Sequence, residues 1–155
     1  MPYNYVFNKF SNNLFQGDAI TAIKLVCTDK YKEHGITAVL CPAWNVDVPY
    51  HHDLAVLKLP IDDHSSIDPK HLDLAAAFYQ LTGRKLFIHC LGGKNRSIAM
   101  VAFFLTLEGM EFEKAWKLVK KHTQADCPYD ELKTSIKNWF NVQQETMNKF
   151  LDPGN

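Results

Sequence analysis

The residues best suited to chemistry lie together in one nine-residue segment, HCLGGKNRS, at positions 89–97. Cys90 closes an apolar run that is typical of a buried strand, and a helix is expected to begin beyond the two glycines. Gly92 and Gly93 let backbone N–H groups turn inward and form an anion-binding nest, to which a helix N-terminus adds the positive end of its dipole. Arg96 follows six residues after Cys90, and its planar fork matches two oxygens of a phosphate. The segment therefore predicts a phosphate site.

The same local field favours the thiolate form of Cys90. A thiolate that shares a cradle with a bound oxyanion is a nucleophile directed at phosphorus. No acid occurs in the 34 residues between Asp73 and Glu108, where the average frequency of acids in the chain would place between three and four. The charged residues in that window are all basic: Arg84, Lys85, Lys94 and Arg96. A buried strand and a buried helix explain some of the missing acids, but not the common sign of the remaining charges.

The elements that must position this segment alternate between strands and helices. Strands are predicted by apolar runs, within 11–17 and over 36–41, 54–61 and 85–90. Helices are predicted after the capping residues Asp18 and Asp68, over 98–107 and 112–122, and from Pro128 onward. The alternation predicts an α/β fold with a central, mainly parallel sheet of four to five strands flanked by helices. Ligands bind beyond the carboxyl ends of such strands, which is where Cys90 lies.

Length and composition narrow the possible classes of protein. A chain of 155 residues without repeats or linkers predicts one domain over residues 1–155. Seventeen basic and seventeen acidic residues leave no net charge, which argues against a strongly basic nucleic-acid binder, and we expect no extended nucleic-acid surface. The N-terminus lacks signal-peptide features, and the longest apolar run, Ile98–Leu105, is short of the roughly 18–20 residues of a membrane span. We therefore expect a cytoplasmic protein with reduced thiols at Cys27, Cys41 and Cys127.

The segment 89–97 resembles the HCxxGxxRS signature of the cysteine-dependent protein tyrosine phosphatases, with Cys90, Arg96 and Ser97 in register, His89 in front and Gly93 in the middle. Three other stretches are similar to segments of the small dual-specificity branch of that superfamily. They are LFQGDAITA (14–22), similar to LyxGdxxxA; HGITAVL (34–40), similar to gIthvl; and LPIDD (59–63), similar to IPxxD. The resemblance spans roughly residues 14–140.

The resemblance implies a phosphomonoester hydrolase that works through a cysteinyl-phosphate. Cys90 would attack phosphorus, and Ser97 would hydrogen-bond the sulfur and help it to leave in the second step. His89 would orient the loop and tune the thiol. The phosphate oxygens would be held by Arg96 together with the backbone amides of the phosphate loop, made of Leu91, Gly92, Gly93, Lys94, Asn95 and Arg96.

The general acid implied by the resemblance is the last residue of the IPxxD segment. Asp63 occupies that position, and Asp62 is the rival because both lie on the same short loop. The acid would protonate the leaving oxygen and then activate water. No metal or other cofactor is expected, since the anion cradle supplies the electrostatic stabilisation.

The resemblance leaves several substrates open. Phosphotyrosine in proteins is the leading one, with phosphoserine and phosphothreonine beside it, for an enzyme expected to be a monomer. Lys94 matches a lysine of phosphoinositide-directed relatives, although Leu91 lacks their second basic residue, and an RNA 5′-triphosphate is a further alternative. A phosphate-binding pseudophosphatase is less favoured because Cys90 and Arg96 are both present. A sulfur-carrying, rhodanese-like protein would not need Arg96 and Ser97 at the helix start.

Two features depart from the family pattern or point elsewhere. Relatives often carry an Asn after a Pro near the last helix, which buttresses the phosphate loop, but Tyr129 stands there, so loop support must come from elsewhere. The histidines and acid of 51–53 have no recognised metal-site spacing, and no metal is expected there. The three tryptophans are expected in or beside the core: Trp44, Trp116 and Trp139.

Overall fold

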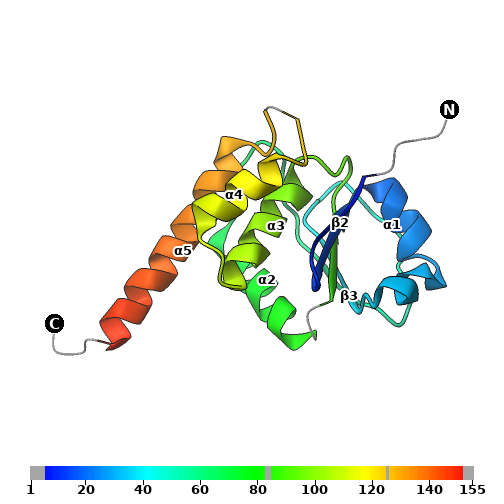
Figure 1. Ribbon diagram of the computed structural model, residues 1–155, viewed down its shortest axis with the longest axis horizontal. Coiled ribbons are helices and arrows are strands. Elements are labelled where there is room, and N and C mark those ends of the chain that lie inside the picture. Colours follow the sequence, from blue (N-terminus) through cyan, green and yellow to red (C-terminus); the bar gives the residue numbers. More distant parts are fainter. Residues whose placement is uncertain (1–5, 83–84, 125, 152–155) are drawn as a thin grey trace.

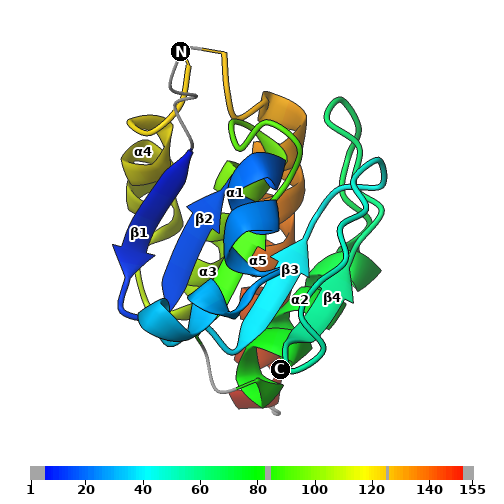
Figure 2. The same cartoon turned by 90° about the vertical axis from the view of Figure 1, so that its right-hand side faces the viewer.

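A five-stranded sheet runs through the centre of the computed structural model, which describes residues 6–82, 85–124 and 126–151 (Figures 1 and 2). The strand order is β1-β2-β5-β3-β4, and only the pairing of β1 with β2 is antiparallel. The strands are β1 (Phe7–Ser11), β2 (Leu14–Gly17), β3 (Ala38–Cys41), β4 (Ala55–Lys58) and β5 (Leu86–His89). The predicted α/β fold with a mainly parallel sheet is confirmed.

Helices cover both faces of the sheet (Figure 1). Four lie on one face: α2 (Pro69–Leu81), α3 (Arg96–Leu107), α4 (Phe112–Lys120) and α5 (Asp130–Leu151). The other face carries α1 (Ala19–Leu25) and a 3₁₀ helix, η1 (Asp29–His34). The central strand β5 serves both layers, because Leu86 and Ile88 join the core under the four helices while Phe87 joins the core under α1.

The helix behind the phosphate loop, α3, is buried on every side. Every residue from Arg96 to Leu105 is buried, as the almost unbroken apolar run 98–107 predicts. The ring of Phe103 contacts the rings of Trp139 and Phe140 on α5, at centroid distances of 5.0 and 5.4 Å. These contacts pack α3 against α5.

Two predicted helix starts are present with their caps. Asp18 Oδ1 accepts a hydrogen bond of 2.7 Å from the backbone N–H of Thr21 at the start of α1. Asp68 Oδ1 accepts one of 2.9 Å from Lys70 at the start of α2, with Pro69 in the first turn. The first of these caps places α1 directly after β2, beside the end of β5.

Several boundaries differ from the predictions. Strand β1 was not expected, and β4 covers 55–58 rather than 54–61, because the chain leaves the sheet edge after Lys58. The last helix begins at Asp130 instead of Pro128. Gly83, the expected end of the helix after Asp68, lies outside the described residues. Among the described residues, no helix combines the length and apolar character that crossing a membrane requires.

The tryptophans are distributed differently from the prediction. Trp116 is buried in the core, and Trp139 on α5 is partly buried and packs against that core, as expected. Trp44 is 61% exposed, so its expected place in the core is wrong. It follows β3 in a loop whose apolar anchors are the smaller Ala43 and Val46, which leaves the indole outside.

Candidate active site

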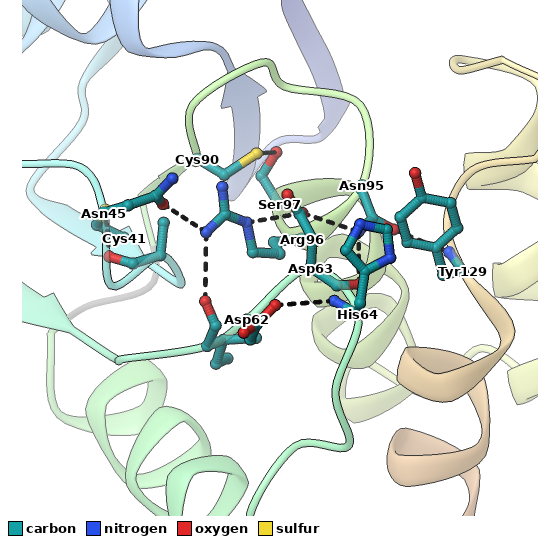
Figure 3. A network of polar contacts seen from close by, with 12 residues as sticks. Cys41, Asn45, Asp62, Asp63, His64, Cys90, Asn95, Arg96, Ser97 and Tyr129 are labelled. Atoms are coloured by element: carbon teal, nitrogen blue, oxygen red, sulfur yellow. Dashed lines mark hydrogen bonds and ion pairs between the residues drawn. The ribbon is translucent and has the colours of Figure 1, made fainter.

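Cys90 lies at the end of the central strand β5, at the edge of the sheet where the parallel strands end (Figure 3). The residue is only 2% exposed, and its Sγ is 3.1 Å from the Oγ of Ser97 in the first turn of α3. The structure thus brings together the two side chains that the resemblance pairs. A hydroxyl at this distance can donate a hydrogen bond to a thiolate.

The loop between Cys90 and α3 is folded as an anion nest. Gly93 has a positive φ of 68°, and a Cβ there would come within 3.0 Å of the backbone N of Asp18 and 3.1 Å of the backbone of Gly17. Within the described part of the chain, the backbone N–H groups of 91–96 donate to no other backbone group. Donors that converge without partners on a tight loop are what an oxyanion binds.

Arg96 is a buried cation, 2% exposed, held from one side by two neutral acceptors. One terminal nitrogen donates to Asn45 Oδ1 at 2.7 Å and to the carbonyl of Ile61 at 3.3 Å. Its Nε lies 2.9 Å from Asp63 Oδ1, but the N–H does not point at this oxygen and has no hydrogen-bond acceptor among the described residues. An oxyanion in the loop would supply that acceptor.

Asn95 joins three segments at the rim of the loop (Figure 3). Its Nδ2 donates to Asp63 Oδ1 at 2.9 Å and to the Asp63 carbonyl at 3.2 Å. Its Oδ1 accepts from the backbone N–H of Tyr129 at 2.8 Å. The expectation that support for the phosphate loop comes from somewhere other than Tyr129 is wrong in part. The side chain of Tyr129 does not support the loop, but its backbone N–H does, through the hydrogen bond to Asn95.

The two candidate acids occupy different positions. Asp63 reaches the pocket and contacts Arg96 and Asn95. Asp62 points away, and its Oδ1 accepts from the backbone N–H of His64 in a local turn at 3.0 Å. The ring of His64 stacks on the ring of Tyr129 at 4.8 Å, which fixes the segment after Asp63 against the mouth of the pocket.

His89 lies behind the loop as a neutral side chain. Its Nδ1 is 3.3 Å from the carbonyl of Cys90, and since a carbonyl only accepts, Nδ1 carries the proton. Nε2 then accepts from the hydroxyl of Tyr50 at 2.7 Å. Burial lowers the pKa of His89 to about 4 and raises the pKa of Tyr50 well above its usual value. His89 therefore orients the loop without adding positive charge.

These side chains surround a pocket of about 320 Å³. Its walls include most of the predicted phosphate loop, the candidate acid Asp63, and three residues from the segment before α5. The lining residues are Asp63, Cys90, Leu91, Gly92, Lys94, Asn95, Arg96, Gln124, Cys127 and Tyr129. Asn45 was missed, because it lies in a loop without a motif and meets Arg96 only through the fold.

The positive charge near Cys90 is smaller than the acid-free window suggested. Lys94 lines the pocket and Arg96 forms its floor, but Lys85 precedes β5 and therefore lies at the opposite end of that strand from Cys90. Arg84 is outside the described residues. The attraction for phosphate thus rests on one buried guanidinium, one lysine and the loop amides.

The His51–Asp53 segment does bring its side chains together, with ligand atoms within 4.8 Å of one another. His51 Nε2 is also 2.9 Å from Asp29 Oδ1, so the ring already has a carboxylate partner. The expectation that the segment holds no metal stays a prediction.

The sequence of the chain matches one family across most of its length. The family described as PTP-SAK, Swiss Army Knife protein, DSP-PTPase phosphatase domain, matches residues 26–147. The chain is 37% identical over 98 residues to rat dual specificity protein phosphatase 12, which covers 57% of this chain but only 29% of that protein. It is 30% identical over 105 residues to Arabidopsis thaliana dual specificity protein phosphatase 1B, covering 64% of this chain and 63% of the relative.

A solved structure shares the fold. The crystal structure of human DUSP28 superposes with a TM-score of 0.74 at 20% identity and covers 93% of this chain and 97% of its own. At that identity the likeness establishes the architecture alone.

The buried, neutral His89 makes stability depend on pH. Its pKa is about 4 in the fold against about 6.5 in an unfolded chain, so the unfolded chain binds more protons between these values. The contribution of the neutral ring is complete above about pH 6.5 and is lost as the pH falls toward 4. We expect the free energy of unfolding to drop between pH 7 and 5 by about 2 kcal/mol more than in a His89→Gln variant, measured by urea unfolding. Equal drops in the two proteins would contradict this account.

Proposed function

The chain belongs to the dual-specificity phosphatase family of the protein tyrosine phosphatase superfamily, and we propose that it hydrolyses phosphomonoesters through a cysteinyl-phosphate. One observation carries the proposal: a thiol, a hydroxyl 3.1 Å from it and a buried guanidinium converge on a loop whose amides have no backbone partner among the described residues. The chain spans only 29% of the length of the rat relative. The activity of this chain is therefore a proposal.

In the first step the Cys90 thiolate attacks phosphorus, so that an S–P bond forms as the ester P–O bond breaks. Asp63 donates a proton to the departing oxygen. Arg96 and the loop amides hold the remaining phosphate oxygens, and their partial positive charges offset the charge that develops on them. Lys94 at the pocket wall adds a further cation.

In the second step water attacks the cysteinyl-phosphate. Asp63, now a carboxylate, takes a proton from that water, the S–P bond breaks, and the electron pair returns to sulfur. Ser97 stabilises the sulfur as it regains its charge, and inorganic phosphate leaves. Because Arg96 Nε also contacts Asp63, a bound phosphate must displace that carboxylate, while Asn95 keeps Asp63 near the leaving oxygen.

The substrate is proposed to be a phosphorylated protein, with phosphotyrosine and also phosphoserine or phosphothreonine as the ester. We infer a cytoplasmic location, since the four cysteines, at 27, 41, 90 and 127, are free thiols, as a reducing compartment requires. A monomer without cofactor is sufficient for the mechanism, because one chain supplies every group named above.

Replacement of the nucleophile tests the proposal directly. We expect Cys90→Ser to lower kcat for an aryl phosphate by more than about 1,000-fold, because a serine hydroxyl is not ionised in this site. Vanadate, an analogue of phosphate, should inhibit the natural chain. The matched control is Cys27→Ser, because Cys27 is a half-buried thiol outside the pocket. This variant should retain activity. Full activity in Cys90→Ser would refute the mechanism.

A second pair of variants assigns the general acid. Asp63→Asn should lower kcat by about 100-fold or more, and most strongly for phenyl phosphate, whose leaving group needs the proton most. Asp62→Asn should stay within a few-fold of the natural chain, since the Asp62 carboxylate accepts from the backbone of its own turn and does not line the pocket. The opposite ranking would transfer the role to Asp62.

A substrate panel separates the alternatives that share this chemistry. We expect kcat/KM for a phosphotyrosine peptide to exceed that for a phosphoinositide or an RNA 5′-triphosphate by about 10-fold or more. Leu91, which is 54% exposed at the rim, supports this order, because it offers no second cation for a polyanionic headgroup. A preference for the phosphoinositide would assign Lys94 to lipid recognition, and phosphopeptide binding without turnover would indicate a pseudophosphatase.

A further inference from the structure

A buried glutamine lies beneath the phosphate loop and has no part in the mechanism described so far. Gln16 belongs to β2, the neighbour of β5, and its side chain is fully buried on the face that α3 covers. The LyxGdxxxA pattern to which this strand is similar leaves its position unspecified. An amide in an otherwise apolar strand is costly to bury unless each of its polar atoms has a partner.

Every polar atom of Gln16 is paired. Its Nε2 lies 2.9 Å from the carbonyl of Gly93 and 2.8 Å from the hydroxyl of Ser97. Its Oε1 accepts from Nδ2 of Asn8 on β1 at 2.9 Å. Since the Gly93 carbonyl can only accept, the atom that faces it must be the nitrogen, and the orientation of the amide follows from this contact alone.

This orientation determines the direction of the next hydrogen bond. An amide nitrogen donates and has no lone pair to offer, so the Ser97 oxygen must be the acceptor in its contact with Gln16. The hydroxyl proton of Ser97 is then left for its other partner, the sulfur of Cys90 at 3.1 Å. The carbonyl of Gly93, four residues before Ser97, is the usual alternative acceptor in a helix, and Gln16 already donates to it.

We propose that Gln16 is a positioning residue that aims the Ser97 hydroxyl at the Cys90 sulfur and ties the phosphate loop to β2. It supplies from the sheet the loop support that relatives obtain from an Asn after a Pro. The proposal rests on the proposed phosphatase function for its kinetic consequence. When the S–P bond breaks, the electron pair returns to sulfur, and a hydroxyl already directed at that atom stabilises it without rearrangement.

Two substitutions by residues similar in size to glutamine distinguish this hydrogen-bonding role from a role of Gln16 in packing alone. Gln16→Met fills the space but donates nothing, so the Ser97 proton is free to turn toward the Gly93 carbonyl. Gln16→Glu keeps the shape but places an acceptor where Nε2 donated, so it repels the Gly93 carbonyl and takes the Ser97 hydroxyl proton away from sulfur. The control is Gln144→Met, because Gln144 is an exposed residue of α5 whose side chain bonds only to Asn148 within the described part of the chain.

The kinetic test uses an aryl phosphate in rapid mixing. We expect Gln16→Met and Gln16→Glu to lower kcat by about 10-fold and KM in parallel, because slower hydrolysis of the cysteinyl-phosphate leaves kcat/KM nearly unchanged. A burst of leaving group should appear as the intermediate accumulates. Ser97→Ala should do the same, and Gln16→Met combined with Ser97→Ala should be no slower than Ser97→Ala alone. Additive losses, or unchanged kcat in both Gln16 variants, would overturn the proposal.

The second readout needs no turnover. The rate of alkylation of Cys90 by iodoacetamide, followed by mass spectrometry of its peptide, rises with pH as the thiolate forms. We expect the midpoint of that rise to move up by about one pH unit in Gln16→Met and in Ser97→Ala, and to stay unchanged in Gln144→Met. An unchanged midpoint in both Gln16 variants refutes the role of Gln16. A shifted midpoint in a chain that hydrolyses no phosphate would instead refute the proposed function.

Discussion

The burial of one guanidinium is the constraint on which the rest of the site depends. Arg96 is almost inaccessible to water, and an isolated buried cation is strongly unfavourable unless acceptors surround it. Its acceptors are Asn45 in the loop after β3 and the carbonyl of Ile61 in the loop after β4, and Asp63 in the latter loop forms an ion pair with it. The guanidinium therefore fixes two loops against the phosphate loop, and the parallel sheet brings the starts of all three to one edge.

The local parts of this design could be predicted from the sequence. A thiol closing an apolar strand, two glycines and an arginine at a helix start are contiguous along the chain, so their spacing determines their geometry. The caps at Asp18 and Asp68 and the fully apolar α3 are local in the same sense, and all are present. The missed strand β1 is exposed on alternate residues and gains its place mainly by pairing with β2.

The contacts that sequence reasoning missed are all nonlocal. Asn45, Asn95 and Gln16 are separated from their partners by dozens of residues, and amides occur in loops and strands for many unrelated reasons. The acid-free window predicts more positive charge near Cys90 than the structure has, because residues close in sequence need not be close in space. The extended strand β5 carries Lys85 to the far end of the sheet from Cys90.

Two uncharged side chains, those of Gln16 and Asn95, support a rigid part and a movable part of the site. Gln16 is fully buried, and its side-chain nitrogen bonds to the loop carbonyl of Gly93 and to the hydroxyl of Ser97 beneath Cys90. Asn95 instead bonds to Asp63, whose side chain is 40% exposed on a loop and shares Arg96 with any incoming phosphate. In the proposed mechanism, Cys90 must keep one geometry through both steps, whereas Asp63 must leave Arg96 when phosphate binds and then act at the position opposite sulfur. The rigid amide therefore belongs beneath Cys90, and the amide at the rim belongs beside Asp63.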